Sequence, residues 1–213
     1  MNKFWRYTIY MLGTLALAAG ITLNTKTGLG VSPMVSVSFG LSENLGLKFS
    51  VLHVIFYVVL ILSQMILDRK VTWAHILQLP VSAVFGVFLD LLGVWITYDY
   101  ASHGIVANLA LLVVAMFFTA LGVCMMVNMN LVMNPGDGIV LSMSNCMKKD
   151  MGFAKNVYDI LCVVFTCVSG LLLRGRIVGI GLGTVISMVC VGRFIAVINK
   201  ASKQKMLRLA GLN

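Results

Sequence analysis

The sequence predicts an all-α membrane protein, a polytopic helix bundle made of two inverted repeats. Hydrophobic residues make up 60% of the 213 residues and charged residues only 11%, whereas soluble domains carry roughly 25% charged residues. The apolar residues form long runs, such as Val51 to Leu62 and Leu109 to Val127, and a run of about 20 apolar residues spans a bilayer. The third observation is an internal repeat.

The two halves of the sequence align in the same order. The stretch around Gly20 aligns with that around Gly122 at an offset of 102 (122 − 20), and the same offset places Ser32-Pro33 on Asn134-Pro135. Farther along the chain the offset becomes 106 (192 − 86 for two glycines). This order indicates a duplication, with a first membrane repeat at 1–104, a second at 105–199 and a basic cytoplasmic tail at 200–213.

Each repeat holds three apolar segments long enough to span a membrane and one that is short. The spans are at about 7–25, 50–67 and 71–96 in the first repeat, and at about 105–127, 154–173 and 177–198 in the second. The short segments, 33–45 and 135–147, would form roughly 20 Å of helix at 1.5 Å per residue, and the hydrocarbon core is about 30 Å thick. We therefore predict one re-entrant half-helix per repeat; a short, tilted span is the alternative.

The two half-helix starts form the main predicted site. Ser and Asn are good N-cap residues, and proline is favoured at the first helical position. A helix N-terminus leaves N–H groups unpaired and carries a partial positive charge, and broken helices at related positions of two repeats indicate a transporter binding site. The predicted solute-binding residues are Ser32, Pro33, Asn134, Pro135, Gly136, Asp137 and Gly138. Ordinary caps of short surface helices are the alternative.

Four ionisable residues within the spans are candidates for proton or ion coupling. Such groups are costly in a membrane and are usually functional or paired. His53 and Asp159 occupy equivalent positions (159 − 53 = 106) and could form a proton relay. Asp90 and Arg193 could pair with each other, or Arg193 with Asp159. A purely structural ion pair is the alternative.

Three glycines at four-residue spacing, Gly175, Gly179 and Gly183, predict a close-packing helix face at the start of the last span. This face could pack within the chain or in a homo-oligomer.

The basic residues cluster at segment ends, which favours a cytoplasmic location of those ends over nucleic-acid binding as the reason for the net charge of +9. Three spans per repeat place both termini on the cytoplasmic side. Eleven basic residues then lie inside and four outside (Lys26, Lys48, Arg174 and Arg176); the eleven are Lys3, Arg6, Arg69, Lys70, Lys148, Lys149, Lys155, Lys200, Lys203, Lys205 and Arg208.

Three glycine-containing stretches, 28–33, 134–138 and 175–184, resemble the YitT/YczE-like family of bacterial integral membrane proteins. The resemblance implies a multi-pass protein of the bacterial cytoplasmic (inner) membrane. It assigns no site residue.

The sequence therefore predicts a secondary carrier for a small polar solute, with an anionic solute as one option because helix N-termini donate N–H groups. Asp137 weighs against a purely anion-selective pocket. A non-transporting scaffold or regulatory subunit is the alternative. Because no P-loop, Rossmann, HExxH or GxSxG motif occurs, we expect no enzyme activity, no cofactor and no metal. The expected partners are the lipid bilayer and the solute, without nucleic acid.

Overall fold

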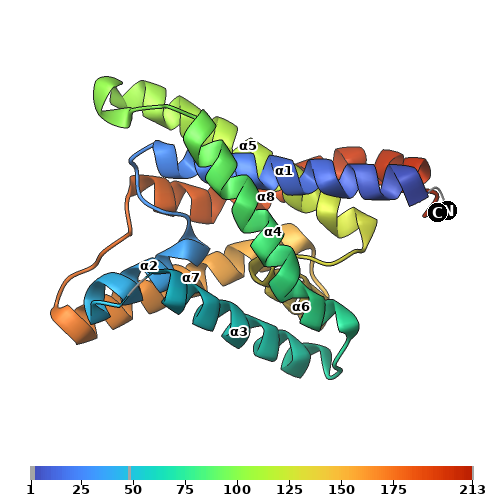
Figure 1. The fold of residues 1–213 in the computed structure, drawn as a ribbon, viewed down its shortest axis with the longest axis horizontal. Helices are drawn as coiled ribbons and strands as arrows, with labels where there is room; N and C mark the ends of the chain where they lie inside the picture. The colour runs from blue at the N-terminus through green and yellow to red at the C-terminus, as the bar shows by residue number, and fades with distance from the viewer. Residues whose placement is uncertain (1–2, 48, 213) are drawn as a thin grey trace.

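The computed structural model describes residues 3–47 and 49–212, and in this part it contains helices and no strand. Lys48, which the sequence analysis places outside, lies beyond the described residues. The all-α class is confirmed. In chain order the elements are α1 (Lys3–Lys26), α2 (Pro33–Leu45), α3 (Phe49–Asp68), α4 (Trp73–Trp95), the 3₁₀ turn η1 (Tyr100–Ser102), α5 (Ile105–Met129), α6 (Pro135–Met147), α7 (Met151–Arg174) and α8 (Leu182–Ala210) (Figure 1).

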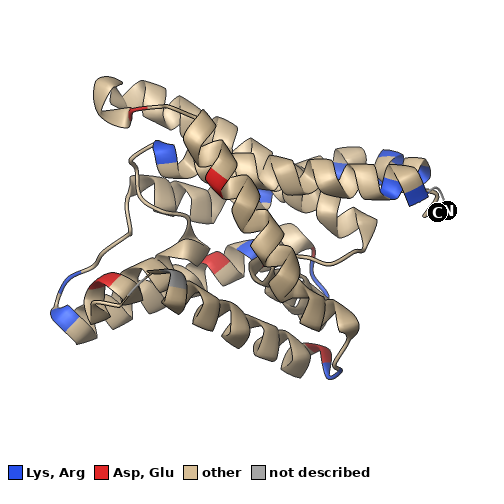
Figure 2. Ribbon diagram, viewed as in Figure 1, with Lys and Arg blue, Asp and Glu red and all other residues tan. Residues whose placement is uncertain are grey.

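Six of the described helices are long and apolar enough to cross a membrane: α1, α3, α4, α5, α7 and α8. The chain is thus a polytopic helical membrane protein. The Lys and Arg residues lie mostly near helix ends and in connections (Figure 2), where charged groups reach the headgroups and water.

The two short segments form helices with the predicted bounds, and both helices, α2 and α6, have 13 residues. Their N-caps have nearly the same extended conformation, with φ −61° and ψ 150° at Ser32 and φ −63° and ψ 148° at Asn134. Each is followed by a proline, whose fixed φ suits the first helical position. Each helix ends at a residue in the left-handed conformation, Gly46 or Lys148, which is a common way to terminate a helix.

The glycine face predicted at 175–183 does not form. Gly175 ends α7 with φ 64°, and Gly179 has φ 86° in the connection to α8. These positive φ angles leave the right-handed helical region. Helix α8 therefore begins at Leu182, and of the three predicted glycines only Gly183 lies on it. The predicted span at 177–198 therefore starts five residues later than expected (182 − 177).

Helix α8 also continues through the predicted tail as far as Ala210. Its last turns, with Met206 and Ala210, pack against Ile9 of α1 and Met129 of α5. The two chain termini consequently lie close together at one end of the bundle (Figure 1).

The antiparallel helices α1 and α5 form the largest helix–helix contact, and glycines allow their close approach. A Cβ added to Gly122 would lie 2.5 Å from the amide nitrogen of Leu17, and one added to Gly20 would overlap that of Thr119. These contacts relate equivalent positions (122 − 20 and 119 − 17 both equal 102). Two backbones that pack this closely gain van der Waals contact, the main source of helix association in membranes.

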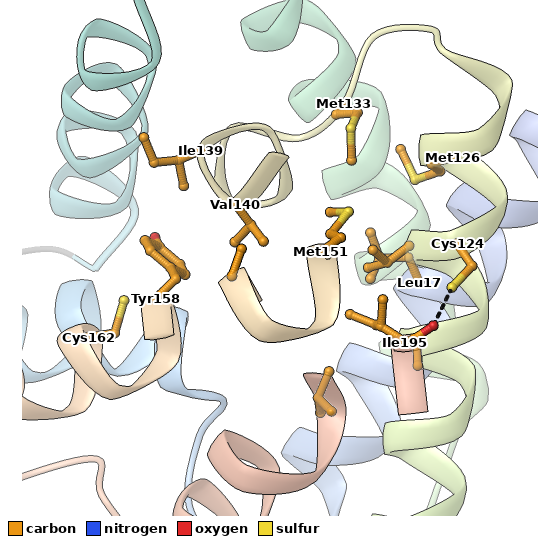
Figure 3. Close-up of a cluster of buried hydrophobic side chains, with 14 of the residues drawn as sticks. Leu17, Cys124, Met126, Met133, Ile139, Val140, Met151, Tyr158, Cys162 and Ile195 are labelled. Carbon is orange, nitrogen blue, oxygen red and sulfur yellow. Dashed lines mark hydrogen bonds between the residues drawn. The ribbon is translucent and has the colours of Figure 1, made fainter. Parts of the chain in front are cut away.

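The remaining helices pack around this pair in a matched pattern. Helix α2 packs on α7 and α6 packs on α3, while α4 contacts α1 and α8 contacts α5. Side chains from both halves share one core, which includes Val140, Met151 and Tyr158. The cysteine Cys124 belongs to the same core, and its Sγ donates to the Ile195 carbonyl at 3.4 Å (Figure 3). Met34 of α2 packs against this core, and Ile139 and Val140 of α6 belong to it.

Candidate functional site

A cavity lies where the first turns of α2 and α6 meet. Its wall includes Ser32, Pro33 and Met34 at the start of α2, and Asn134 and Asp137 at the start of α6. Helices α1, α5, α7 and α8 complete it, with Tyr57 of α3 and Phe85 of α4. The space open to the centres of water molecules is about 50 Å³, and one water needs roughly 10–15 Å³ on that measure. The cavity thus has room for a few waters or a small solute.

The two helix starts touch each other inside the protein. The sulfur of Met34 occupies the space that a side chain on Gly136 would fill. These residues hold equivalent positions in the two halves (136 − 34 = 102). Gly136 therefore lets the first turns of α2 and α6 approach each other.

The extended chain before each short helix is held by side chains from other helices. The Thr184 hydroxyl donates to the carbonyl of Val31 at 2.6 Å, and the Tyr10 hydroxyl donates to the carbonyl of Val132 at 2.6 Å. Gly30 has φ 108°, and an added Cβ would lie 2.6 Å from Thr184 Oγ1. Such contacts satisfy backbone groups that have no helical partner, as non-helical backbone within a membrane protein requires.

A pair of buried glutamines positions the start of α6. Gln64 and Gln78 exchange hydrogen bonds of 3.0 and 2.7 Å, and Gln64 Nε2 also donates to the Pro135 carbonyl at 3.1 Å. Gly138 makes room for the pair, because an added Cβ would lie 2.8 Å from Gln78 Nε2. Pro135 and Gly138 are thus buried in the supporting structure and do not line the cavity.

In the part of the chain that the structure describes, three charged side chains line the cavity, and all come from the second half of the chain. Asp137 belongs to α6, and Lys155 and Asp159 lie one turn apart on α7. The exposed fractions are 9% for Asp137, 9% for Lys155 and 1% for Asp159. Lys155 Nζ donates to Asp159 Oδ1, and Asp137 interacts electrostatically with both residues. Asp137 also lies in the first turn of α6, where a carboxylate complements the helix dipole.

Two buried oxygens at the cavity have no hydrogen-bond partner in the described part of the chain, Asp159 Oδ2 and Asn134 Oδ1. Buried polar groups are nearly always hydrogen-bonded, so these unmatched acceptors indicate a place for a ligand or water.

The structure brings some predicted residues together and separates others. Ser32, Pro33, Asn134, Asp137 and Asp159 all line the cavity.

His53 lies outside the cavity. Its Nδ1 is 2.8 Å from Ser38 Oγ, and its ring lies 4.3 Å, centroid to centroid, from that of Tyr57, a cavity-lining residue. A direct His53–Asp159 relay is therefore not formed.

Asp90 and Arg193 are exposed on α4 and α8 and do not line the cavity. No ion pair joins either of them to another described residue. The suggested pairing of Arg193 with Asp159 is wrong, because Lys155 occupies that position.

Sequence reasoning missed Lys155, which it counted among the cytoplasmic residues. The face of α7 that carries Lys155, Asp159, Cys162 and Thr166 is buried, so this lysine is drawn into the protein. The four-residue spacing of Lys155 and Asp159 is the signal that could have identified the pair. The glutamine pair was missed as well, although each glutamine interrupts an apolar run.

Comparison with known proteins places the chain in a family. A family model described as a family of unknown function, DUF6198, matches residues 4–200. The chain belongs to this family. The DUF6198 chain is also 26% identical, over 187 residues, to the uncharacterized protein YyaS of Bacillus subtilis (strain 168), an alignment that covers 88% of each protein. No solved structure gave a significant match.

The bacterial relative agrees with the bacterial origin implied by the sequence resemblance. The narrower YitT/YczE-like assignment stays a prediction.

Proposed function

We propose that this protein is a secondary carrier for a small polar solute, which binds between the starts of α2 and α6. The observation that carries the proposal is the cavity at these two helix starts, with buried charges and unmatched acceptors on its wall. Binding sites of this kind, at broken helices near the middle of the membrane, are found in secondary transporters built from repeats.

The repeat architecture supports the proposal. In our interpretation α2 and α6 are re-entrant half-helices that enter from opposite faces, and the two halves are inverted repeats. The matched packing of α2 on α7 and α6 on α3 supports this interpretation. So does the return of the chain after α1, because Ser32 shares the cavity with Leu17, near the middle of α1.

The two halves differ in a way that suits alternating access. Gly152 and Gly192 are in close contact, since a Cβ on Gly192 would overlap the Gly152 carbonyl oxygen. The equivalent residues Gly46 and Gly86 (each lower by 106) have open space instead. Helix α4 is thus less closely packed on the first half than α8 is on the second. In the proposed cycle the two halves exchange these arrangements around the central site.

The proposed orientation has both termini on the cytoplasmic side of a bacterial inner membrane. The termini lie at the same end of the bundle (Figure 1), where several Lys and Arg residues gather (Figure 2). Reporter fusions test this orientation: a fluorescent protein that folds in the cytoplasm should be active on either end, and alkaline phosphatase on neither end.

Flux in proteoliposomes tests the carrier proposal. A panel of small polar solutes is first screened for thermal stabilisation of the purified chain, and uptake of the best one is then measured. We expect Asp137→Asn and Asp159→Asn to lower uptake at least tenfold. Glu43→Gln, which changes an exposed carboxylate on α2, is the matched control. If the flux is coupled to protons through these carboxylates, internal acidification should follow uptake in the parent protein only; unchanged flux in both variants would eliminate this role.

Cysteine labelling separates the carrier from a scaffold or regulatory subunit. In a variant without the natural cysteines, Ser32→Cys places a thiol at the cavity wall and Leu112→Cys places one in the closed core, where Leu112 is 1% exposed. A carrier predicts that a small water-soluble thiol reagent modifies the first and spares the second. Protection of both would favour the scaffold.

A further inference from the structure

We propose that the solute carries a protonated amino group and that this group binds on the α6–α7 side of the cavity. The inference rests on the proposed carrier function for the location of the site. It narrows the solute class from small and polar to cationic or zwitterionic amines.

The first argument is charge. Asp137 and Asp159 contribute two carboxylates to the cavity wall and Lys155 contributes one ammonium group, so the ionised set carries one excess negative charge. An uncompensated buried charge is expensive in a low-dielectric environment. A ligand with one positive charge removes the excess.

The second argument is hydrogen bonding. An ammonium group has three N–H donors and no acceptor. The cavity wall offers two buried acceptors without a hydrogen-bond partner among the described residues, Asn134 Oδ1 and Asp159 Oδ2, and the Asp137 carboxylate as a third acceptor. An ammonium group can donate to all three groups, whereas an anion can pair with none of them and would face two carboxylates.

The positive ends of the two short helices do not reverse this preference for a cationic ligand. A helix start is equivalent to about half a positive charge, and at α6 it faces the full negative charge of Asp137 in its own first turn. Among the described residues, Lys155 is the only cationic side chain on the wall, and it is already bonded to Asp159. An anionic solute therefore has no free cation to bind on the α6 side.

The side of the cavity formed by the first half of the chain lacks charged side chains among the described residues, and this difference would orient a bound solute. The residues equivalent to Asp137, Lys155 and Asp159 are Val35, Phe49 and His53, and none of them lines the cavity. On that side the wall has Ser32, Met34 and the start of α2, which carries no acidic residue in its first turn. A carboxylate on a zwitterionic solute would face this helix start, while its amino group faces α6.

Ligand-induced thermal stabilisation of the full-length purified protein tests the inference. The probes are methylammonium chloride, glycine, sodium acetate and potassium chloride at constant ionic strength. We expect methylammonium or glycine to raise the melting temperature in a saturable way, and acetate and potassium to have no such effect. Tighter binding of glycine than of methylammonium would identify a zwitterion; the reverse would identify a simple amine.

Matched variants tie the binding to the site. Asp137→Asn should weaken binding of the stabilising amine at least tenfold, and Glu43→Gln should not change it. If Asp137→Asn does not fold, protection of Ser32→Cys from a thiol reagent by the same amine replaces this measurement. Saturable stabilisation by acetate in place of either amine, or amine binding that is indifferent to Asp137→Asn, would overturn the inference.

Flux measurements keep this inference distinct from the carrier proposal. Binding of methylammonium without its uptake into proteoliposomes would contradict the carrier and leave the ligand class intact. Uptake of acetate without amine binding would support a carrier and contradict the ligand class.

Discussion

The sulfur of Met34 fills the space beside Gly136, so that the first turns of α2 and α6 meet at equivalent positions of the two halves. Met34 also lines the cavity. The contact thus links the packing of the two helix starts directly to the shape of the candidate site.

Replacing Gly136 by alanine should push the Met34 side chain toward the cavity. Because methionine is flexible, we expect a small stability loss, about 1 kcal/mol at the low end of overpacking effects, with a several-fold lower flux or ligand affinity. Met34→Ala in the same chain should restore both. The measurements are thermal unfolding in detergent and uptake in proteoliposomes. If Gly136→Ala lowers stability and uptake equally in the parent protein and in the Met34→Ala variant, the contact with Met34 is not the cause.

The Lys155–Asp159 pair should be strongly coupled in stability. Removing one partner of a buried pair leaves a charge without compensation and typically costs about 3–5 kcal/mol, whereas replacing both can be nearly neutral. We therefore expect Lys155→Met to lower the free energy of unfolding by several kcal/mol. The double variant Lys155→Met, Asp159→Asn should recover most of it. A double-mutant cycle measured by unfolding gives the coupling, and additive losses would contradict a direct pair.

The crossing of α1 and α5 should not tolerate a side chain at Gly122. An added Cβ would lie 2.5–2.8 Å from backbone atoms of Gly13 and Leu17, and backbone cannot move aside as a flexible side chain can. We expect Gly122→Ala to destabilise the protein by about 1–3 kcal/mol or more. Gly93→Ala is the control, because nothing lies within 4 Å of its added Cβ. Equal melting temperatures for the two variants would be inconsistent with the close approach.

The open space at Gly86 predicts a variant that binds solute but does not transport it. If α4 must close on the first half as α8 does on the second, Gly86→Trp blocks the closure and leaves the present arrangement intact. We expect uptake to fall at least tenfold, with a melting temperature and an amine affinity close to those of the parent. Val87→Trp, at a residue that is 55% exposed, should transport normally. Normal uptake by Gly86→Trp would argue against this exchange of arrangements.

Much of the candidate site was predictable because its signals are local. A proline after Ser32 or Asn134 fixes the start of a helix, and the lengths of the apolar runs fix which helices are too short to span. The alignment of the two halves then indicates that these starts are related. The boundaries of α2 and α6 and the presence of Asp137 at the site follow from this information alone.

The predictions that failed concern positions whose conformation depends on contacts between distant residues. Gly175 and Gly179 have helical spacing, but their positive φ angles are set by the path of the chain between α7 and α8. Val31, for example, donates its amide N–H to the Gly179 carbonyl at 3.2 Å. Helical spacing by itself does not reveal such a break.

Hydropathy and proline geometry act over a few residues, so the helical membrane class, the six long helices and the two short, proline-led ones follow from the amino-acid order alone. Lys155 joins Asp137 and Asp159 in one cavity, while Asp90 and Arg193 stay on the surface, and this depends on how the helices pack in three dimensions. The physical reason is that lipid is as apolar as the core. The lipid-facing and core-facing sides of a membrane helix therefore look alike in sequence, and packing against other helices decides which charges are enclosed.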